Sequence, residues 1–195
     1  MSKPTYYDNR AQFWKKHYEM ALPYEEYLLT DPEKAQRWRD FEPRAPELTP
    51  EQKQRVQGYN RKINILIYSG IWCGDCVRQV PIIRKIAEAA GEKINVKLIE
   101  RETSPELMEE LRIMGATRVP RIVFLTEDFW EIDRAGDRLL PVYKAKAARE
   151  IGMNHDAGVM TPKALQEETE AWVNEFERIL LMARLSPPLR HRHSD

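Results

Sequence analysis

The sequence predicts an α/β fold in which a central mixed sheet of about four strands is flanked by helices, with helical extensions at both ends of the chain. Between residues 61 and 136, apolar β-favouring segments alternate with helix-favouring ones in the order strand, helix, strand, helix, strand, strand. This order implies a mixed sheet with helices on its faces. Residues 1–60 and 137–195 instead show helix start signals and helical spacing. We therefore expect a core at 61–136, an N-terminal helical extension, and a C-terminal helical extension that packs on the core.

Composition limits the classes of function. The 195 residues are 42% apolar and 32% charged, with a formal net charge of zero. The absence of a basic excess argues against a nucleic-acid partner, because phosphate binding needs local positive charge. No apolar run approaches the length of a membrane span, and the first residues lack an apolar signal-peptide segment. With two cysteines in the chain, we expect a cytoplasmic protein without structural disulfides.

The elements of the core are bounded by caps and glycines. The expected strands are Ile63–Tyr68, Asn95–Glu100, Arg121–Thr126 and Phe129–Asp133, and the expected helices are Cys73–Ala90 and Ser104–Met114. Gly91 and Gly115 follow these helices, where glycine commonly ends a helix.

The N-terminal extension is aromatic and helix-favouring. Expected helices span residues 9–21, 32–41 and 50–59, and Phe13, His17 and Met20 are predicted to share one face of the first. Five aromatic residues could either line a binding surface or pack the extension onto the core or a partner: Trp14, Tyr18, Tyr24, Tyr27 and Trp38. Their helical spacing favours packing.

The C-terminal extension contains a long amphipathic helix. Thr161-Pro162 is a start signal, Ser186-Pro187-Pro188 ends the helix, and an apolar stripe runs between them. Residues 152–158 are expected to form a loop around the lone His155, and residues 190–193 a frayed polar tail.

Both cysteines lie in the segment Trp72-Cys73-Gly74-Asp75-Cys76, between an apolar strand and a helix. A thiolate at a helix N-terminus is stabilised by unpaired backbone N–H groups and by the helix dipole. The spacing therefore predicts Cys73 as the nucleophile and the more exposed thiol, and Cys76 as the resolving thiol. We expect Gly74 to let a partner backbone approach and Trp72 to shield one side of the site from water.

Two alternatives compete with a redox site. A structural zinc site usually takes four Cys or His ligands, and no second pair of ligands is spaced near the motif, so no metal is expected within one chain. A zinc site bridging two copies of the chain stays open. Two incidental buried cysteines would not explain their placement between a strand and a helix.

The motif resembles the active site of thioredoxins, with Asp75 where thioredoxins have proline. Pro81, five residues after Cys76, matches the proline that kinks their active-site helix, and Gly115–Pro120 before the third strand matches the segment with their cis-proline. The resemblance covers about residues 60–135 and is greatest to bacterial thioredoxin-like proteins with a WCGDC motif. It implies a thioredoxin-like fold, a cis Pro120 facing the cysteines, and Val119 pairing with an extended substrate.

The sequence departs from that family at three positions. Ile67 stands where thioredoxins keep a buried aspartate that relays protons for the resolving thiol. Arg118, two residues before Pro120, is expected to narrow the substrate groove or to select acidic partners. Asp75 adds negative charge beside Cys73, which should raise the pKa of that thiol relative to a proline-bearing motif unless Arg118 and Arg121 offset it.

Two functions follow as hypotheses. The first is a thiol-disulfide oxidoreductase, expected to act as a reductant, that needs no cofactor beyond a reversible Cys73–Cys76 disulfide. Its partners would be a disulfide-containing protein or small-thiol substrate and an external dithiol electron donor, and a homodimer is compatible with the sequence. The second is a thioredoxin-fold binding or scaffold module whose CxxC is residual or regulatory. Ile67, in place of the relay aspartate, and Arg118, which would crowd the groove, favour this second hypothesis.

Overall fold

A mixed four-stranded sheet forms the centre of the protein, in a computed structural model that describes residues 6–194. Its strands are β1 (Ile63–Ser69), β2 (Ile94–Glu100), β3 (Arg121–Thr126) and β4 (Glu131–Ala135). The spatial order is β2-β1-β3-β4, with β1 parallel to β2 and the other two pairings antiparallel. The predicted fold class is confirmed.

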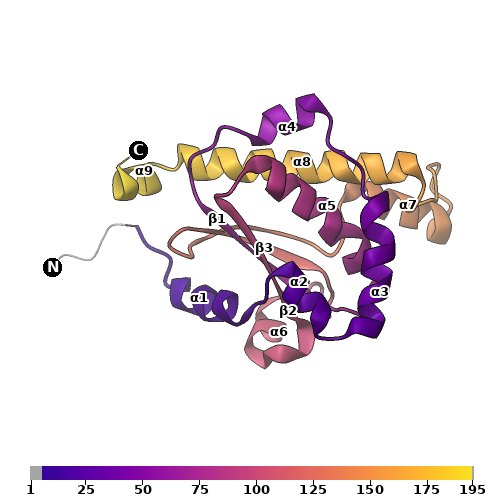
Figure 1. Cartoon of the computed structure of the whole chain (residues 1–195), viewed down its shortest axis with the longest axis horizontal. Helices are drawn as coiled ribbons and strands as arrows, with labels where there is room; N and C mark the ends of the chain where they lie inside the picture. Colours follow the sequence, from indigo (N-terminus) through magenta and orange to yellow (C-terminus); the bar gives the residue numbers. More distant parts are fainter. Residues whose placement is uncertain (1–5, 195) are drawn as a thin grey trace.

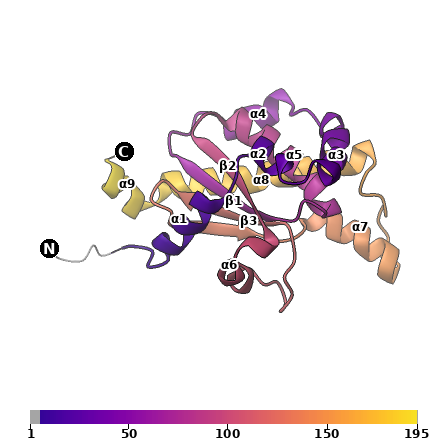
Figure 2. The same cartoon turned by 60° about the horizontal axis from the view of Figure 1, so that its bottom comes forward.

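Helices cover both faces of this sheet (Figure 1). They are α1 (Ala11–Met20), α2 (Tyr24–Leu29), α3 (Pro32–Phe41), α4 (Pro50–Val56), α5 (Gly74–Ala90), α6 (Pro105–Glu110), α7 (Leu140–Ile151), α8 (Pro162–Leu185) and α9 (Pro187–His193), with short 3-10 turns η1 (Glu42–Arg44) and η2 (Arg101–Thr103). In the two views, α4, α5 and α8 lie on one side of the sheet and α1 and α6 on the other (Figure 2). In the described residues, none of these helices combines the length and apolarity that crossing a membrane requires.

The central position of β1 explains its apolar sequence. All seven of its residues are buried, because helices cover both faces and a strand pairs with each edge. Strands in that position read as continuous apolar runs. The ring of Phe124 on β3 meets that of Phe176 on α8 edge to face, with 5.7 Å between centroids, which ties the long C-terminal helix to the sheet.

The aromatic residues of the N-terminal extension are core residues. Each of them is at most 7% exposed: Trp14, Tyr18, Tyr24, Tyr27 and Trp38. The packing prediction is therefore confirmed and the binding-surface alternative is wrong. An antiparallel bridge between Leu22 and Leu98 also attaches the chain after α1 to the edge strand β2.

The predicted face of α1 needs a correction. Trp14, His17 and Tyr18 are its buried residues, whereas Met20 is 41% exposed. The helix turns its aromatic residues inward, and the His17 ring nitrogens are held by the Phe13 carbonyl and the Ser104 hydroxyl at 2.8 Å each. His17 is thus a buried core histidine whose two ring nitrogens both have hydrogen-bond partners.

The fourth strand and the C-terminal tail also differ from expectation. Strand β4 begins at Glu131 because the chain turns through Phe129, which has a φ of 61°, before it pairs with β3. Residues 187–193 form α9 and are not a frayed tail: Arg192 and His193 contact the Asp128 carboxylate at 2.7 and 2.8 Å. The polar residues of this segment therefore dock it onto the β3–β4 turn.

Candidate active site

Cys73 lies at the N-cap of α5, where the chain passes from β1 into the helix. Its N–H donates to the Gly70 carbonyl at 2.8 Å, and its own carbonyl accepts the Val77 N–H at 3.0 Å. Cys76 lies in the first turn of α5. Cys73 is 8% exposed and Cys76 is 0% exposed, so the thiol nearer the loop is the more accessible one.

The two thiols differ in acidity. Hydrogen bonding from the Cys76 thiol, helped by the backbone N–H groups of Cys76 and Asp75, lowers the pKa of Cys73 to about 7 against the opposing effect of burial. Burial raises the pKa of Cys76 well above its ordinary value, and the neighbouring Cys73 sulfur adds to this. At neutral pH the site therefore contains a partly ionised sulfur beside a protonated one.

The segment before β3 lies against this pair. The Val119–Pro120 peptide bond is cis, both residues are buried, and the Val119 carbonyl accepts a hydrogen bond from the Cys73 thiol at 3.6 Å. Next to them, the guanidinium of Arg118 pairs with the Asp137 carboxylate at 3.2 Å and its side chain is 36% exposed.

Helix α3 supports the loop that carries Trp72. The Trp38 indole N–H donates to the Ile71 carbonyl at 2.8 Å, and Arg37 donates to the Trp72 carbonyl at 3.2 Å. The indole of Trp72 folds over Gly70, where a Cβ atom would lie 2.8 Å from the ring, so only glycine fits beneath it. Trp72 itself stays 41% exposed.

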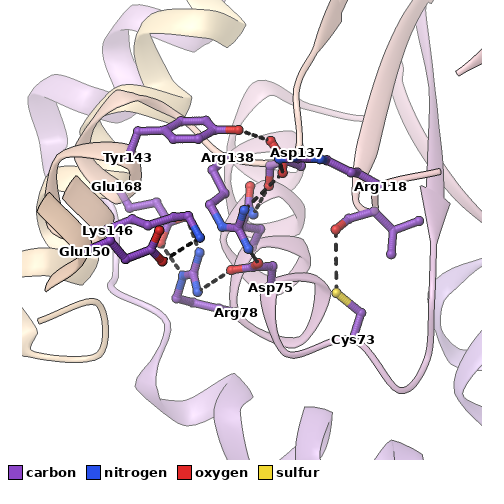
Figure 3. A network of polar contacts seen from close by, with 12 residues as sticks. Cys73, Asp75, Arg78, Arg118, Asp137, Arg138, Tyr143, Lys146, Glu150 and Glu168 are labelled. Carbon is purple, nitrogen blue, oxygen red and sulfur yellow. Dashed lines mark hydrogen bonds and ion pairs between the residues drawn. The ribbon is translucent and has the colours of Figure 1, made fainter. Parts of the chain in front are cut away.

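Asp75 is held by two arginines (Figure 3). Its carboxylate pairs with Arg78, one turn further along α5, at 2.8 Å and with Arg138, just before α7, at 2.5 Å. This charge is therefore neutralised locally. Asp75 does raise the pKa of Cys73 by Coulomb repulsion, but this is the smallest of the causes that act on that thiol.

The expectation that Arg118 and Arg121 offset Asp75 is wrong. Arg118 pairs with Asp137, while the electrostatic neighbours of Arg121 include Arg134, Glu131 and Asp133 on β4. The tertiary structure instead brings Arg138 to Asp75 from 63 residues away in the sequence.

The same network ties the C-terminal extension to the motif. Arg78, 5% exposed, also pairs with the fully buried Glu168 of α8 at 2.7 Å. The Asp137 carboxylate accepts hydrogen bonds from Arg138 at 3.0 Å and from the Tyr143 hydroxyl at 2.5 Å (Figure 3). Helices α7 and α8 are thereby fixed relative to the N-terminal turn of α5.

Pro81 and Ile67 lie behind the cysteines. Pro81 is buried inside α5, where it cannot donate an N–H to the Val77 carbonyl. Ile67 is fully buried in β1. The position expected to carry a relay acid is thus apolar and closed to solvent.

A groove of about 740 Å³ opens beside Cys73. It lies between α3, the motif and the loop before α8, and Arg37, Arg44, Trp72, Cys73 and Met160 are among its lining residues. Gly74 also lines it, and a Cβ there would come no nearer than 3.5 Å to the Arg37 guanidinium. The groove therefore gives access to Cys73 from this side.

The residues that the structure describes offer no metal centre. Within 6–194, no three His, Cys, Asp or Glu side chains gather closely enough to hold an ion. Both cysteines are free thiols. The chemistry available at this site is that of the two sulfurs.

Comparison with known proteins places this geometry in a family. A family model described as thioredoxin matches residues 21–147. The chain belongs to the thioredoxin family. The match includes part of each segment that flanks residues 61–136, so the family resemblance extends into both extensions.

Individual thioredoxin-like relatives are distant. The chain is 22% identical over 114 residues to the thioredoxin-like protein slr1139 of Synechocystis. The aligned region covers 58% of this chain and 82% of that protein. A crystal structure of a protein of unknown function, PA1234 from Pseudomonas aeruginosa, matches with a TM-score of 0.61 at 16% identity, covering 85% of this chain and 95% of the other. An HIV epitope-scaffold matches with a TM-score of 0.65 at 15% identity, covering 85% and 96%. The two structures show the fold.

Sequence reasoning missed the charged partners of the motif. Arg78 follows Asp75 by three residues on a predicted helix, a spacing that signals an ion pair. Arg138, Asp137 and Glu168 carry no such signal, because their proximity to the motif depends on how α7 and α8 pack.

Proposed function

We propose that this protein is a thiol-disulfide oxidoreductase with a WCGDC active site, in which Cys73 is the nucleophile and Cys76 the resolving thiol. The observation that supports this most is the asymmetry of the pair. The more acidic sulfur is the one beside the groove, whereas the less acidic one is sealed in the core. Distinct roles for two thiols require this difference.

In the proposed reaction, the Cys73 thiolate attacks one sulfur of a substrate disulfide and releases the other as a thiolate. Cys76 then attacks Cys73, which releases the second substrate sulfur and leaves a Cys73–Cys76 disulfide. The cis Pro120 and the backbone of Val119 would position the substrate beside Cys73, with Arg118 as a further substrate contact. No cofactor is required, and an external dithiol donor would restore the reduced pair.

We propose reduction as the physiological direction. A nucleophilic thiol with a pKa of about 7 is far less acidic than those of strong disulfide oxidants, whose pKa is about 3.5. A less stabilised thiolate favours the disulfide form of the enzyme and thus donation of electrons to the substrate. A reduction potential near about −120 mV, measured against glutathione, would contradict this direction.

Trapping tests the assigned roles. Cys76→Ser should accumulate mixed disulfides through Cys73 in cell extract, because the resolving thiol is lost, and Cys73→Ser should accumulate none. The captured proteins would identify the substrates, and reduction of insulin would show whether the protein acts on a general disulfide. Equal trapping by both variants would overturn the assignment.

The remaining expectations belong to this proposal. We also propose a core at 61–136 with extensions at 1–60 and 137–195. A cytoplasmic location fits an intracellular reductant, as do disulfide-containing protein or small-thiol partners. The network of Asp75, Arg78 and Glu168 gives the C-terminal extension a role in fixing the motif. The alternative of a binding module is not favoured, since it leaves the acidity of Cys73 without a purpose.

A further inference from the structure

Glu100 is a half-buried carboxylate that the reaction above does not use. It is the last residue of β2 and lies opposite Ser69, the last residue of β1, in the parallel register. Its Oε2 atom accepts the backbone N–H of Ile71 at 2.9 Å and the Tyr27 hydroxyl at 2.5 Å. The carboxylate is thus anchored to the loop that leads into the motif, two residues before Cys73.

Two hydroxyl groups lie between Glu100 and Cys76. Tyr27, which is 1% exposed, reaches from α2 to the carboxylate. The fully buried Ser69 lies close enough to both the Cys76 thiol and the Tyr27 hydroxyl to lower the pKa of each. In the described part of the chain the Ser69 Oγ atom makes no hydrogen bond, so Ser69 can join its two neighbours only if its hydroxyl turns toward each of them.

The resolving step needs a proton acceptor near Cys76. This thiol is fully buried and its pKa is raised by burial, so it does not ionise at neutral pH without help. Ile67 provides no base, and the carboxylate of Asp75 is occupied by two guanidinium groups. Burial raises the pKa of Glu100, which makes its carboxylate a stronger base than an exposed one.

A second opening gives Glu100 access to water. A cleft of about 610 Å³ is lined by Tyr27, Ile71, Trp72 and Glu100, among other residues. Trp72 borders both this cleft and the groove at Cys73. Because Glu100 lines the cleft and not the groove, a proton that reaches Glu100 has a route to solvent outside the groove.

We propose that Glu100 accepts the proton of Cys76, through Ser69 and Tyr27, when Cys76 resolves the mixed disulfide. The inference rests on the proposed oxidoreductase function and assigns the proton route of its second step. Glu100 acts through the two hydroxyl groups and does not contact the reacting sulfurs.

The step balances in protons and electrons. As the Cys76 sulfur bonds to Cys73, the bond between Cys73 and the substrate sulfur breaks, and its electron pair leaves with the substrate. The Cys76 proton passes to Ser69, which gives its own proton to Tyr27. Tyr27 gives its proton to Glu100, while the departing substrate thiolate is protonated by water. The enzyme dithiol is oxidised and the substrate disulfide is reduced.

Other charged and titratable groups near Glu100 modulate its basicity. Glu102 of η2 raises its pKa further, and Lys34 of α3 and Tyr68 of β1 lie within electrostatic range. None of them bridges the carboxylate to Cys76.

The test isolates the second step. The Cys73 thiolate of the reduced protein attacks Ellman's reagent, releases one coloured thionitrobenzoate and forms a mixed disulfide with the other. Attack by Cys76 then releases this second thionitrobenzoate, whose release rate is measured. For the wild-type protein, the release rate should rise with pH as Glu100 ionises and then level off. Glu100→Gln keeps an oxygen that can accept both hydrogen bonds, so the fold is preserved. It should slow release at neutral pH by about 10- to 100-fold and make the rate depend on hydroxide across the pH range.

Two further variants complete the design. Tyr27→Phe interrupts the route and should change the pH profile in the same way as Glu100→Gln. Glu106→Gln is the matched control: it alters an exposed carboxylate of α6 that pairs with Lys16 of α1, and it should leave the profile unchanged. An unchanged profile in Glu100→Gln overturns the relay alone. Failure of Cys73 to form the adduct at all would overturn the proposed function and the relay with it.

Discussion

The acidity of Cys73 depends on the side chain of Cys76, and this dependence can be measured. The pKa of Cys73 falls from an ordinary value of 9.0 to about 7, and the hydrogen bond from Cys76 is the largest cause. That difference corresponds to about 2.7 kcal/mol of preferential stabilisation of the thiolate. The backbone N–H groups of Asp75 and Cys76 supply the remainder against the cost of burial.

Substitution of Cys76 separates the side-chain hydrogen bond from the backbone ones. Cys76→Ala removes the donor and should raise the pKa of Cys73 by one unit or more, a loss of about 1.4 kcal/mol. The thiolate fraction at pH 7 would then fall from about half to about one tenth. Cys76→Ser retains a hydroxyl donor at the same position, so the pKa of Cys73 should stay near 7.

Alkylation by iodoacetamide across a pH series reads out this difference, because the thiolate is the reacting form. The Cys76→Ala protein should alkylate about fivefold more slowly than Cys76→Ser at pH 7, and the two should converge at high pH. The protein that carries both Cys73→Ser and Cys76→Ser is the control for background reaction, because each compared variant has Cys73 as its one remaining cysteine. The reasoning is refuted if Cys76→Ala and Cys76→Ser give the same pKa.

Three further predictions concern the charged network and the terminal helix. Arg78→Met leaves the buried Glu168 without its guanidinium and should cost about 3–5 kcal/mol of stability at neutral pH. The cost should shrink at about pH 5, because burial already raises the pKa of Glu168 and its neutral form is tolerated; urea unfolding with equal losses at both pH values would contradict this. Asp75→Asn should lower the pKa of Cys73 by less than about half a unit, because repulsion from Asp75 is the weakest of the effects that set this pKa; a larger fall in an alkylation series would show that the arginines do not screen Asp75. Arg192→Ala removes an exposed ion pair from α9 and should cost less than about 1 kcal/mol, but faster amide exchange should appear in α9 alone.

Local signals in the sequence determined the core elements. Apolar runs such as Ile63–Tyr68 predict buried strands, and the N-cap at Thr161 with Pro162 predicts the start of α8 within a residue. Such elements can be predicted because caps, prolines and hydrophobic periodicity act within a few residues of the chain. Phe129 shows the limit, since its positive φ moves the start of β4 and no residue nearby signals it.

At the candidate site, too, some features follow from local sequence and others from tertiary packing. The sequence by itself placed Cys73 and Cys76 three residues apart at the start of one helix, and this spacing predicts the order in which the two thiols would react. Only the tertiary structure decided what surrounds them: Arg138 neutralises Asp75, and Glu100 lies near the motif through Tyr27. The physical reason is that these contacts join segments far apart in the chain. They exist only once α2, the sheet and the residues before α7 have packed, and no local pattern encodes that packing.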